Sequence, residues 1–171
     1  MKSEIKNKIN KRFISIIVIC WIIDFITKIW AVDALKGAEG ISIIGEYLRF
    51  HYVLNTGGIF GIGQGNPMPF QILTGIAIVF LLTYYLRSEE SGTLFEISIA
   101  LVAGGAFGNF TDRFFREGVV DFIDMGIGSS RWPTYNPADA FISIGAVLLA
   151  IAFYQIEKEL KQKEKNAAKV K

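Results

Sequence analysis

The residue types that could do chemistry in this chain are gathered in one stretch, from Ala103 to Asp139. The stretch reads AGGAFGNFTDRFFREGVVDFIDMGIGSSRWPTYNPAD and contains four aspartates: Asp112, Asp121, Asp124 and Asp139. It begins inside one apolar run and ends at the start of another. Ionisable residues at membrane helices are costly to bury and usually mark functional sites. This stretch is therefore the candidate functional site.

Paired carboxyl groups are the chemistry that such a stretch supports best. Two acids held close together cannot both ionise cheaply, so they share one proton. The ionised acid can then take a proton from water while its protonated partner polarises a carbonyl group. Val119–Asp124 has the pattern of a short strand, in which Asp121 and Asp124 would point to opposite faces. Spacing alone lets either of them meet Asp139, which opens the next helix.

Other chemistries have weaker support in the sequence. No Gly-x-Ser-x-Gly motif occurs, and His51 has no evident serine or cysteine partner. Cys20 lies in an apolar run, where we expect a buried structural thiol. One histidine and one cysteine exclude a multi-histidine metal site, and the acids alone would specify a hard cation only weakly. We therefore expect neither a metal nor a cofactor.

Several polar residues could support the acids. Asp112 and Arg113 follow Asn109 by three and four positions, so all three can share one face of a helix. One interpretation is that they cap the end of that helix by satisfying its free carbonyl groups, and for Asp112 a structural role is favoured. Asn136 is either a turn former or a neighbour of the paired acids.

A second pair of charges lies within the first apolar run. Asp24 and Lys28 are four residues apart with the acid first, so they share a helix face and can pair. Charges inside a membrane helix normally face the protein interior. The pair either locks this helix into the bundle or contributes to the site, since many buried ion pairs do no chemistry.

The rest of the chain predicts a mainly α integral membrane protein. Of its 171 residues, 51% are hydrophobic, and four apolar runs are long enough to cross a bilayer. We place these spans at about 13–32, 69–86, 94–110 and 138–154, within a single membrane-embedded domain covering 1–171. Small residues recur every fourth position in the third span, at Ala100, Gly104 and Gly108, which favours close helix packing.

The two longer connections, 33–68 and 111–137, are too polar to span. Residues 46–54 alternate in character, with Leu48, Phe50, Tyr52 and Leu54 on one face, which predicts a strand in a small curved sheet on the membrane surface. Basic residues crowd both ends of the chain, so we expect both termini in the cytoplasm and both connections outside. Outside the tails there is no basic face with interleaved aromatics, so no nucleic-acid partner is expected.

Three motifs and two shorter patterns resemble the lipoprotein signal peptidases (signal peptidase II), which are aspartyl peptidases of the bacterial cytoplasmic (inner) membrane. The motifs are GNFTDR at Gly108–Arg113, VVDF at Val119–Phe122 and NPAD at Asn136–Asp139. The shorter patterns are Asp24-x-x-x-Lys28 and Asn55-x-Gly57. They occur in the family's order on a frame of four spans.

The resemblance implies that Asp121 and Asp139 are the catalytic pair. It also implies that the segment with Asn55 and Gly57 lines the substrate groove, and that Asn109 and Arg113 position substrate and hold the active-site backbone. Two departures stand out: Gly58-Ile59 replaces two alanines that are common in the family, and Tyr135 stands where Phe is usual.

The implied activity is removal of the signal peptide from prolipoproteins, by cleavage before a cysteine that carries a diacylglyceryl group. The partners would be that lipidated substrate and membrane lipids, and the enzyme would act as a monomer without a cofactor. One alternative is a small proton-coupled transporter that uses Asp24 and the outer acids as a relay, although the internal repeats common in transporters are not evident. A non-enzymatic membrane scaffold would leave the dense acids unexplained.

Overall fold

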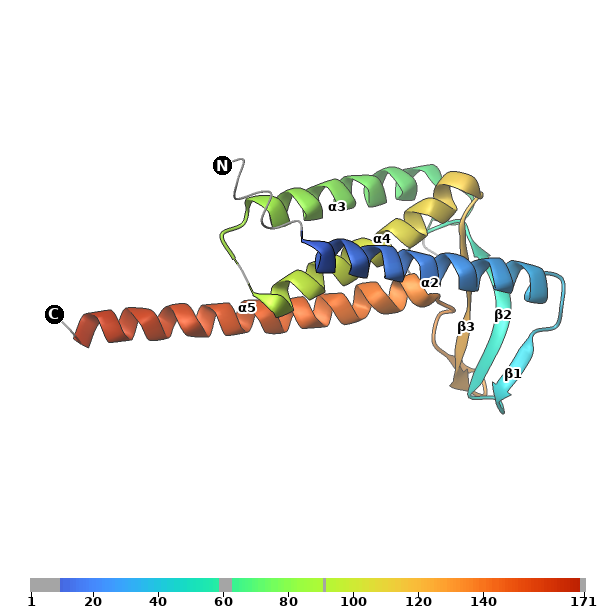
Figure 1. Ribbon diagram of the computed structural model, residues 1–171. Helices are drawn as coiled ribbons and strands as arrows, with labels where there is room; N and C mark the ends of the chain where they lie inside the picture. Colours follow the sequence, from blue (N-terminus) through green and yellow to red (C-terminus); the bar gives the residue numbers. More distant parts are fainter. Residues whose placement is uncertain (1–9, 59–62, 91, 170–171) are drawn as a thin grey trace.

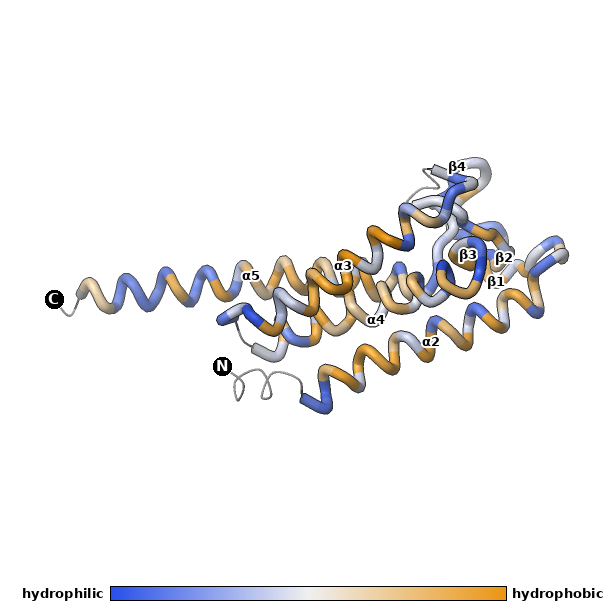
Figure 2. Tube along the Cα trace, turned by 90° about the horizontal axis from the view of Figure 1, so that it is seen from above, coloured by the Kyte–Doolittle hydropathy of each residue, from blue (hydrophilic) through white to orange (hydrophobic). Residues whose placement is uncertain are grey.

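Four long helices dominate the computed structural model, which describes residues 10–58, 63–90 and 92–169. The helices are α2 (Lys11–Leu35), α3 (Met68–Arg87), α4 (Thr93–Phe115) and α5 (Pro137–Lys169). Each is long and apolar enough to cross a membrane, and Figure 2 shows the apolar residues along them. The predicted fold, four membrane helices with a small sheet, is confirmed.

Two helices extend beyond their predicted ends. We expected the third span to stop at residue 110, but α4 continues to Phe115, and α5 runs past residue 154 to Lys169. Hydropathy marks only the apolar part of a helix, whereas the Glu, Lys, Gln and Leu residues that follow in α5 are good helix formers. Consequently Asp112 and Arg113, which we placed in a connection, lie on the last helical turns of α4.

Helix α4 packs against the three other helices. Its small residues allow α2 to approach closely: a Cβ at Gly104 would lie 2.7 Å from the Cβ of Cys20, whose side chain is buried as expected. A Cβ at Gly108 would lie 2.4 Å from Oδ2 of Asp24. The small-residue stripe therefore acts in packing, and Gly108 also leaves the space that a buried carboxylate occupies.

A four-stranded antiparallel sheet covers one end of the bundle (Figure 1). Its strands, in spatial order, are β1 (Ile41–Ile44), β2 (Leu48–Asn55), β3 (Val119–Ile127) and β4 (Ser130–Arg131). In the register between β2 and β3, Val53 pairs with Asp121 and Leu48 with Met125. Val120 and Phe122 of β3 form a buried apolar cluster with Ala31 and Leu35 of α2, which anchors the sheet to the helices.

The segment before α5 is hydrogen-bonded to β3. Tyr135 forms an isolated antiparallel bridge with Ile123, in which the Ile123 N–H donates to the Tyr135 carbonyl at 2.8 Å. The Tyr135 N–H donates back to the Ile123 carbonyl at 3.1 Å. The Tyr135 hydroxyl, absent where the family has Phe, donates to the sulfur of Met125 at 3.0 Å. This bridge brings the start of α5 beside β3.

Asp124 of β3 lies between two arginines on neighbouring strands. Arg49 of β2 donates to its Oδ2 at 2.7 and 2.9 Å, and Arg131 of β4 donates to its Oδ1 at 2.9 Å. Burial disfavours ionisation of this carboxyl, but the hydrogen bonds from Arg131 and Arg49 outweigh that effect and lower its pKa. Asp124 therefore ties three strands together and is engaged away from the other acids.

We expect Asp124→Asn to lower the melting temperature of the detergent-solubilised protein at neutral pH by about 2 to 8 °C, for a loss of about 1 to 2 kcal/mol. Because the folded pKa is depressed, the stabilisation is complete above the ordinary carboxyl value of about 3.9 and is lost as the pH falls through the lower folded pKa. Thermal unfolding from pH 7 to pH 3 measures this. The exposed Asp33→Asn is the control, and a deficit that stayed constant over this range would contradict the assignment.

Candidate active site

Asp139 and Asn136 are fixed by the first turn of α5. The Asp139 N–H donates to Oδ1 of Asn136 at 3.0 Å, and the Asn136 N–H donates to Oδ2 of Asp139 at 3.2 Å. This reciprocal arrangement is a capping box, and Pro137 occupies the first helical position, where proline is favoured. Because Oδ1 of Asn136 accepts from the backbone, its amide nitrogen must point elsewhere.

That amide nitrogen reaches Asp121, whose side chain is 3% exposed. Asn136 Nδ2 donates to Oδ1 of Asp121 at 2.6 Å, and Asn55 Nδ2 donates to its Oδ2 at 3.1 Å. Burial and the negative charge of Asp139 raise the pKa of Asp121 to about 7, although the two amide donors oppose the shift. Asp121 can therefore keep a proton near neutral pH.

Asn109 of α4 joins the two acids through a second amide. Its Nδ2 donates to Oδ1 of Asp139 at 2.7 Å, while its Oδ1 accepts from Asn136 Nδ2 at 3.1 Å. Asp121 and Asp139 thus belong to one hydrogen-bonded network, in which Asn136 touches both. Asp124 has a separate set of partners on the sheet, so Asp121 is the acid that meets Asp139.

Lys28 is almost fully buried, with 1% of its side chain exposed. Its ammonium group lies 2.8 Å from Asp24 Oδ2, 2.9 Å from Asn109 Oδ1 and 3.3 Å from Asp112 Oδ2. Asp24 also accepts the N–H of Ala138 at 3.0 Å. The expected Asp24–Lys28 pair therefore forms, and it reaches both α4 and the first turn of α5.

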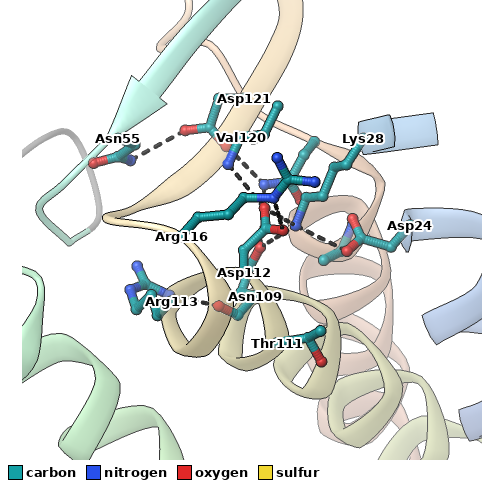
Figure 3. A network of polar contacts seen from close by, with 12 residues as sticks. Asp24, Lys28, Asn55, Asn109, Thr111, Asp112, Arg113, Arg116, Val120 and Asp121 are labelled. Atoms are coloured by element: carbon teal, nitrogen blue, oxygen red, sulfur yellow. Dashed lines mark hydrogen bonds and ion pairs between the residues drawn. The ribbon is translucent and has the colours of Figure 1, made fainter. Parts of the chain in front are cut away.

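The helix-cap interpretation of Asp112 is wrong, because a carboxylate accepts hydrogen bonds and cannot satisfy free carbonyl groups. Asp112 Oδ2 accepts the N–H of Val120 at 2.9 Å, and Oδ1 pairs with Arg116 Nε at 3.2 Å (Figure 3). The residue is structural, as favoured, but it holds the backbone of β3. It thereby fixes the strand residue next to Asp121.

Arg113 does contact carbonyl groups. Its Nη1 reaches the Asn109 carbonyl at 3.5 Å and its Nη2 donates to the Gly57 carbonyl at 3.1 Å. Within the described part of the chain, its Nε is buried and has no hydrogen-bond partner. Arg113 thus links the end of α4 to the segment after β2, which the family resemblance implies lines the substrate groove.

Sequence reasoning missed Gln64. Its Nε2 donates to Oδ1 of Asn55 at 3.2 Å, and the Gly57 N–H donates to the same oxygen at 3.1 Å. Together they turn the amide nitrogen of Asn55 towards Asp121. Nothing in the local sequence marks Gln64, because the contact depends on how the connection folds back over β2.

Gly58 replaces one of the alanines that are common in the family, and packing explains the replacement. A Cβ at Gly58 would lie 2.5 Å from Cε1 of Phe70, at the start of α3. The Phe70 ring therefore occupies the space that an alanine would need. Ile59, the second departure, lies outside the described residues.

An apolar groove of about 710 Å³ lies between α3 and α4. Its lining includes Gly75 and Phe80 of α3 and Phe110 and Phe114 of α4. The two phenylalanines of α4 flank Arg113 in the sequence, one turn apart.

The comparisons with known proteins agree with this geometry. A family model described as signal peptidase (SPase) II matches residues 16–155. The lipoprotein signal peptidase of Halothermothrix orenii is 37% identical over 143 residues, covering 84% of this chain and 95% of that protein. The lipoprotein signal peptidase of Syntrophomonas wolfei is 38% identical over 146 residues, covering 85% and 93%.

Solved structures of bacterial membrane enzymes have a similar fold. One bacterial membrane enzyme superposes with a TM-score of 0.76 at 30% identity, covering 86% of this chain and 90% of the other. Another has a TM-score of 0.74 at 32% identity, covering 85% and 94%. The fold, the site and the relatives lead to one conclusion: the chain belongs to the signal peptidase II family.

Proposed function

We propose that this protein is a membrane aspartyl endopeptidase that removes the signal peptide from diacylglyceryl-modified bacterial prolipoproteins, cleaving before the lipidated cysteine. The family and the relatives named lipoprotein signal peptidases support the substrate. The observation that carries the mechanism is the joining of Asp121 and Asp139 through Asn136 and Asn109. The comparisons give the alternative of a proton-coupled transporter no support.

In the proposed mechanism the two acids have different tasks. Asp121, with a pKa of about 7, carries the shared proton, and the less buried Asp139 is ionised. Asp139 takes a proton from water as the water oxygen attacks the scissile carbonyl carbon, and Asp121 gives its proton to the carbonyl oxygen. When the tetrahedral intermediate collapses, the C–N bond breaks, Asp139 protonates the leaving nitrogen, and Asp121 recovers its proton. The cycle requires no metal.

The charges around the acids favour one shared proton. Four carboxyl groups, those of Asp24, Asp112, Asp121 and Asp139, lie in the same network as three cations. The cations are Lys28, Arg113 and Arg116. The set is neutral when Asp121 and Asp139 hold one proton between them. A buried site of low dielectric favours that state, since an unbalanced charge is expensive there.

The neighbouring residues would hold the substrate. Arg113 fixes the Gly57 carbonyl and Asn55 fixes Asp121, so the segment after β2 would form one wall of the groove for the scissile peptide. The apolar groove between α3 and α4 would take acyl chains or the apolar part of the signal peptide.

Asp121→Asn and Asp139→Asn should each lower cleavage of a diacylglyceryl prolipoprotein by at least about 10² to 10⁴-fold, because an amide cannot accept and return the proton. Activity of the wild type should fall at low pH, as the ionised acid gains a proton, and at high pH, as Asp121 loses its proton near its pKa of about 7. Initial rates of the purified protein in detergent measure both effects. Asp124→Asn is the control and should keep most of the activity, so full activity in either variant of the pair would refute the mechanism.

We place the sheet and the acids at the outer face of a multi-pass protein of the bacterial cytoplasmic membrane. The start of α2 and the end of α5 lie at the bundle end away from the sheet, and basic residues are frequent there (Figure 1). A cysteine introduced at the exposed Ser129 should therefore react with an impermeant maleimide added to intact cells. One introduced at the exposed Glu89, between α3 and α4, should react only after permeabilisation, and the reverse pattern would invert the topology.

A further inference from the structure

The orientation of the Asn109 amide follows from the chemistry of Lys28. An ammonium group can only donate hydrogen bonds, so the atom of Asn109 that faces Lys28 Nζ at 2.9 Å must be its oxygen. The amide nitrogen is then directed at Asp139, 2.7 Å away. A hydrogen-bond donor at that position stabilises the negative charge that the proposed mechanism places on Asp139. A rotated amide would present its oxygen to the carboxylate and repel it.

Lys28 is itself held in place on two other sides. Asp24 and Asp112 form ion pairs with it, with N–O distances of 2.8 and 3.3 Å, so three oxygen atoms surround its ammonium group. Asn109 has a second donor, Asn136 Nδ2 at 3.1 Å, but that donor is neutral, and its nitrogen also serves Asp121. The hydrogen bond from the charged lysine is the stronger of the two.

We infer that Lys28 is a positioning residue of the active site, which acts through Asn109 to direct an N–H donor at Asp139 and so keeps that acid in the form that activates water. The inference rests on the proposed function for its kinetic consequence. It also distinguishes the two roles considered for the Asp24–Lys28 pair, because a pair that only joins α2 to the bundle would have no effect on the protonation of Asp139.

The total charge of the network that contains Asp139 must stay constant in the test. The other charged groups of this network are Asp24 and Lys28 from α2, Asp112, Arg113 and Arg116 from α4, and Asp121 from β3. A double variant meets this condition, because removing Asp24 and Lys28 together leaves the total charge of the network unchanged. Asp112 would keep its contacts with Val120 and Arg116.

The test compares Asp24→Asn/Lys28→Met with Asp24→Asn/Lys28→Gln. Methionine and glutamine have similar lengths, but only glutamine can donate to Asn109. We expect the Met variant to lose about 10- to 100-fold in kcat, the scale of a mispositioned reacting group, with little change in KM. The low-pH limb of its activity profile should move to higher pH. The Gln variant should recover most of kcat and return the limb towards its wild-type position.

Arg12→Met/Glu96→Gln is the matched control for helix packing. Arg12 and Glu96 also form an ion pair between α2 and α4, with Nη2 and Oε2 2.8 Å apart, but they do not touch the site network. This control should lower the melting temperature in detergent and leave kcat and the pH profile unchanged. A loss of stability alone is therefore separable from a loss of positioning.

Equal kcat values and pH profiles for the Met and Gln variants would overturn the inference. If the double variants do not fold, Asn109→Leu keeps the ion pair and removes the amide, and an unmoved low-pH limb in that variant would also overturn it. Infrared titration of the aspartate carboxyl groups in substrate-free protein gives a readout without turnover. If the wild type did not cleave prolipoprotein, the proposed function would fail, while this titration would still decide the role of Lys28.

Discussion

The burial of one ammonium group, that of Lys28, is the constraint on which the arrangement of the site depends. A charge that is 1% exposed needs opposite charge beside it, and Asp24 and Asp112 form ion pairs with Lys28 while Asn109 accepts its hydrogen bond. These three partners come from α2 and α4, and Asp24 also accepts the N–H of Ala138 in α5. The contacts that compensate the buried charge of Lys28 therefore fix α2, α4 and α5 relative to one another at the end of the bundle where the sheet lies.

Strand β3 carries two aspartates whose surroundings shift their pKa values in opposite directions. Asp121 accepts hydrogen bonds from the neutral amides of Asn55 and Asn136, so burial and the charge of Asp139 dominate and raise its pKa to about 7. Asp124, three residues later, accepts hydrogen bonds from the guanidinium groups of Arg49 and Arg131, which lower its pKa. Strand alternation separates the two side chains, and the type of partner sets the outcome. One carboxyl group is thereby suited to holding a proton, and the other to holding the sheet together.

Hydrogen bonds between distant parts of the chain fix the relative positions of Asp121 and Asp139. The capping box fixes Asp139 to the start of α5, the bridge between Tyr135 and Ile123 fixes that start to β3, and Asp112 fixes the β3 backbone at Val120. Each link uses backbone groups, which vary little in position once a strand or a helix has formed. The amide side chains of Asn109 and Asn136 then have only short distances to span.

The sequence by itself determined the four membrane helices, the strands around Asp121 and after Glu46, and the helix that Asp139 opens, because these depend on periodicity and on neighbours within a few residues. It also predicted the Asp24–Lys28 pair, which a helix places on one face. Spacing left Asp121 and Asp124 as equal partners for Asp139, and resemblance to a family favoured Asp121. Only the tertiary structure decided between them on physical grounds, through the register that sets Arg49 opposite Asp124. The roles of Asp112 and Gln64 likewise depend on contacts between distant segments, which no local pattern encodes.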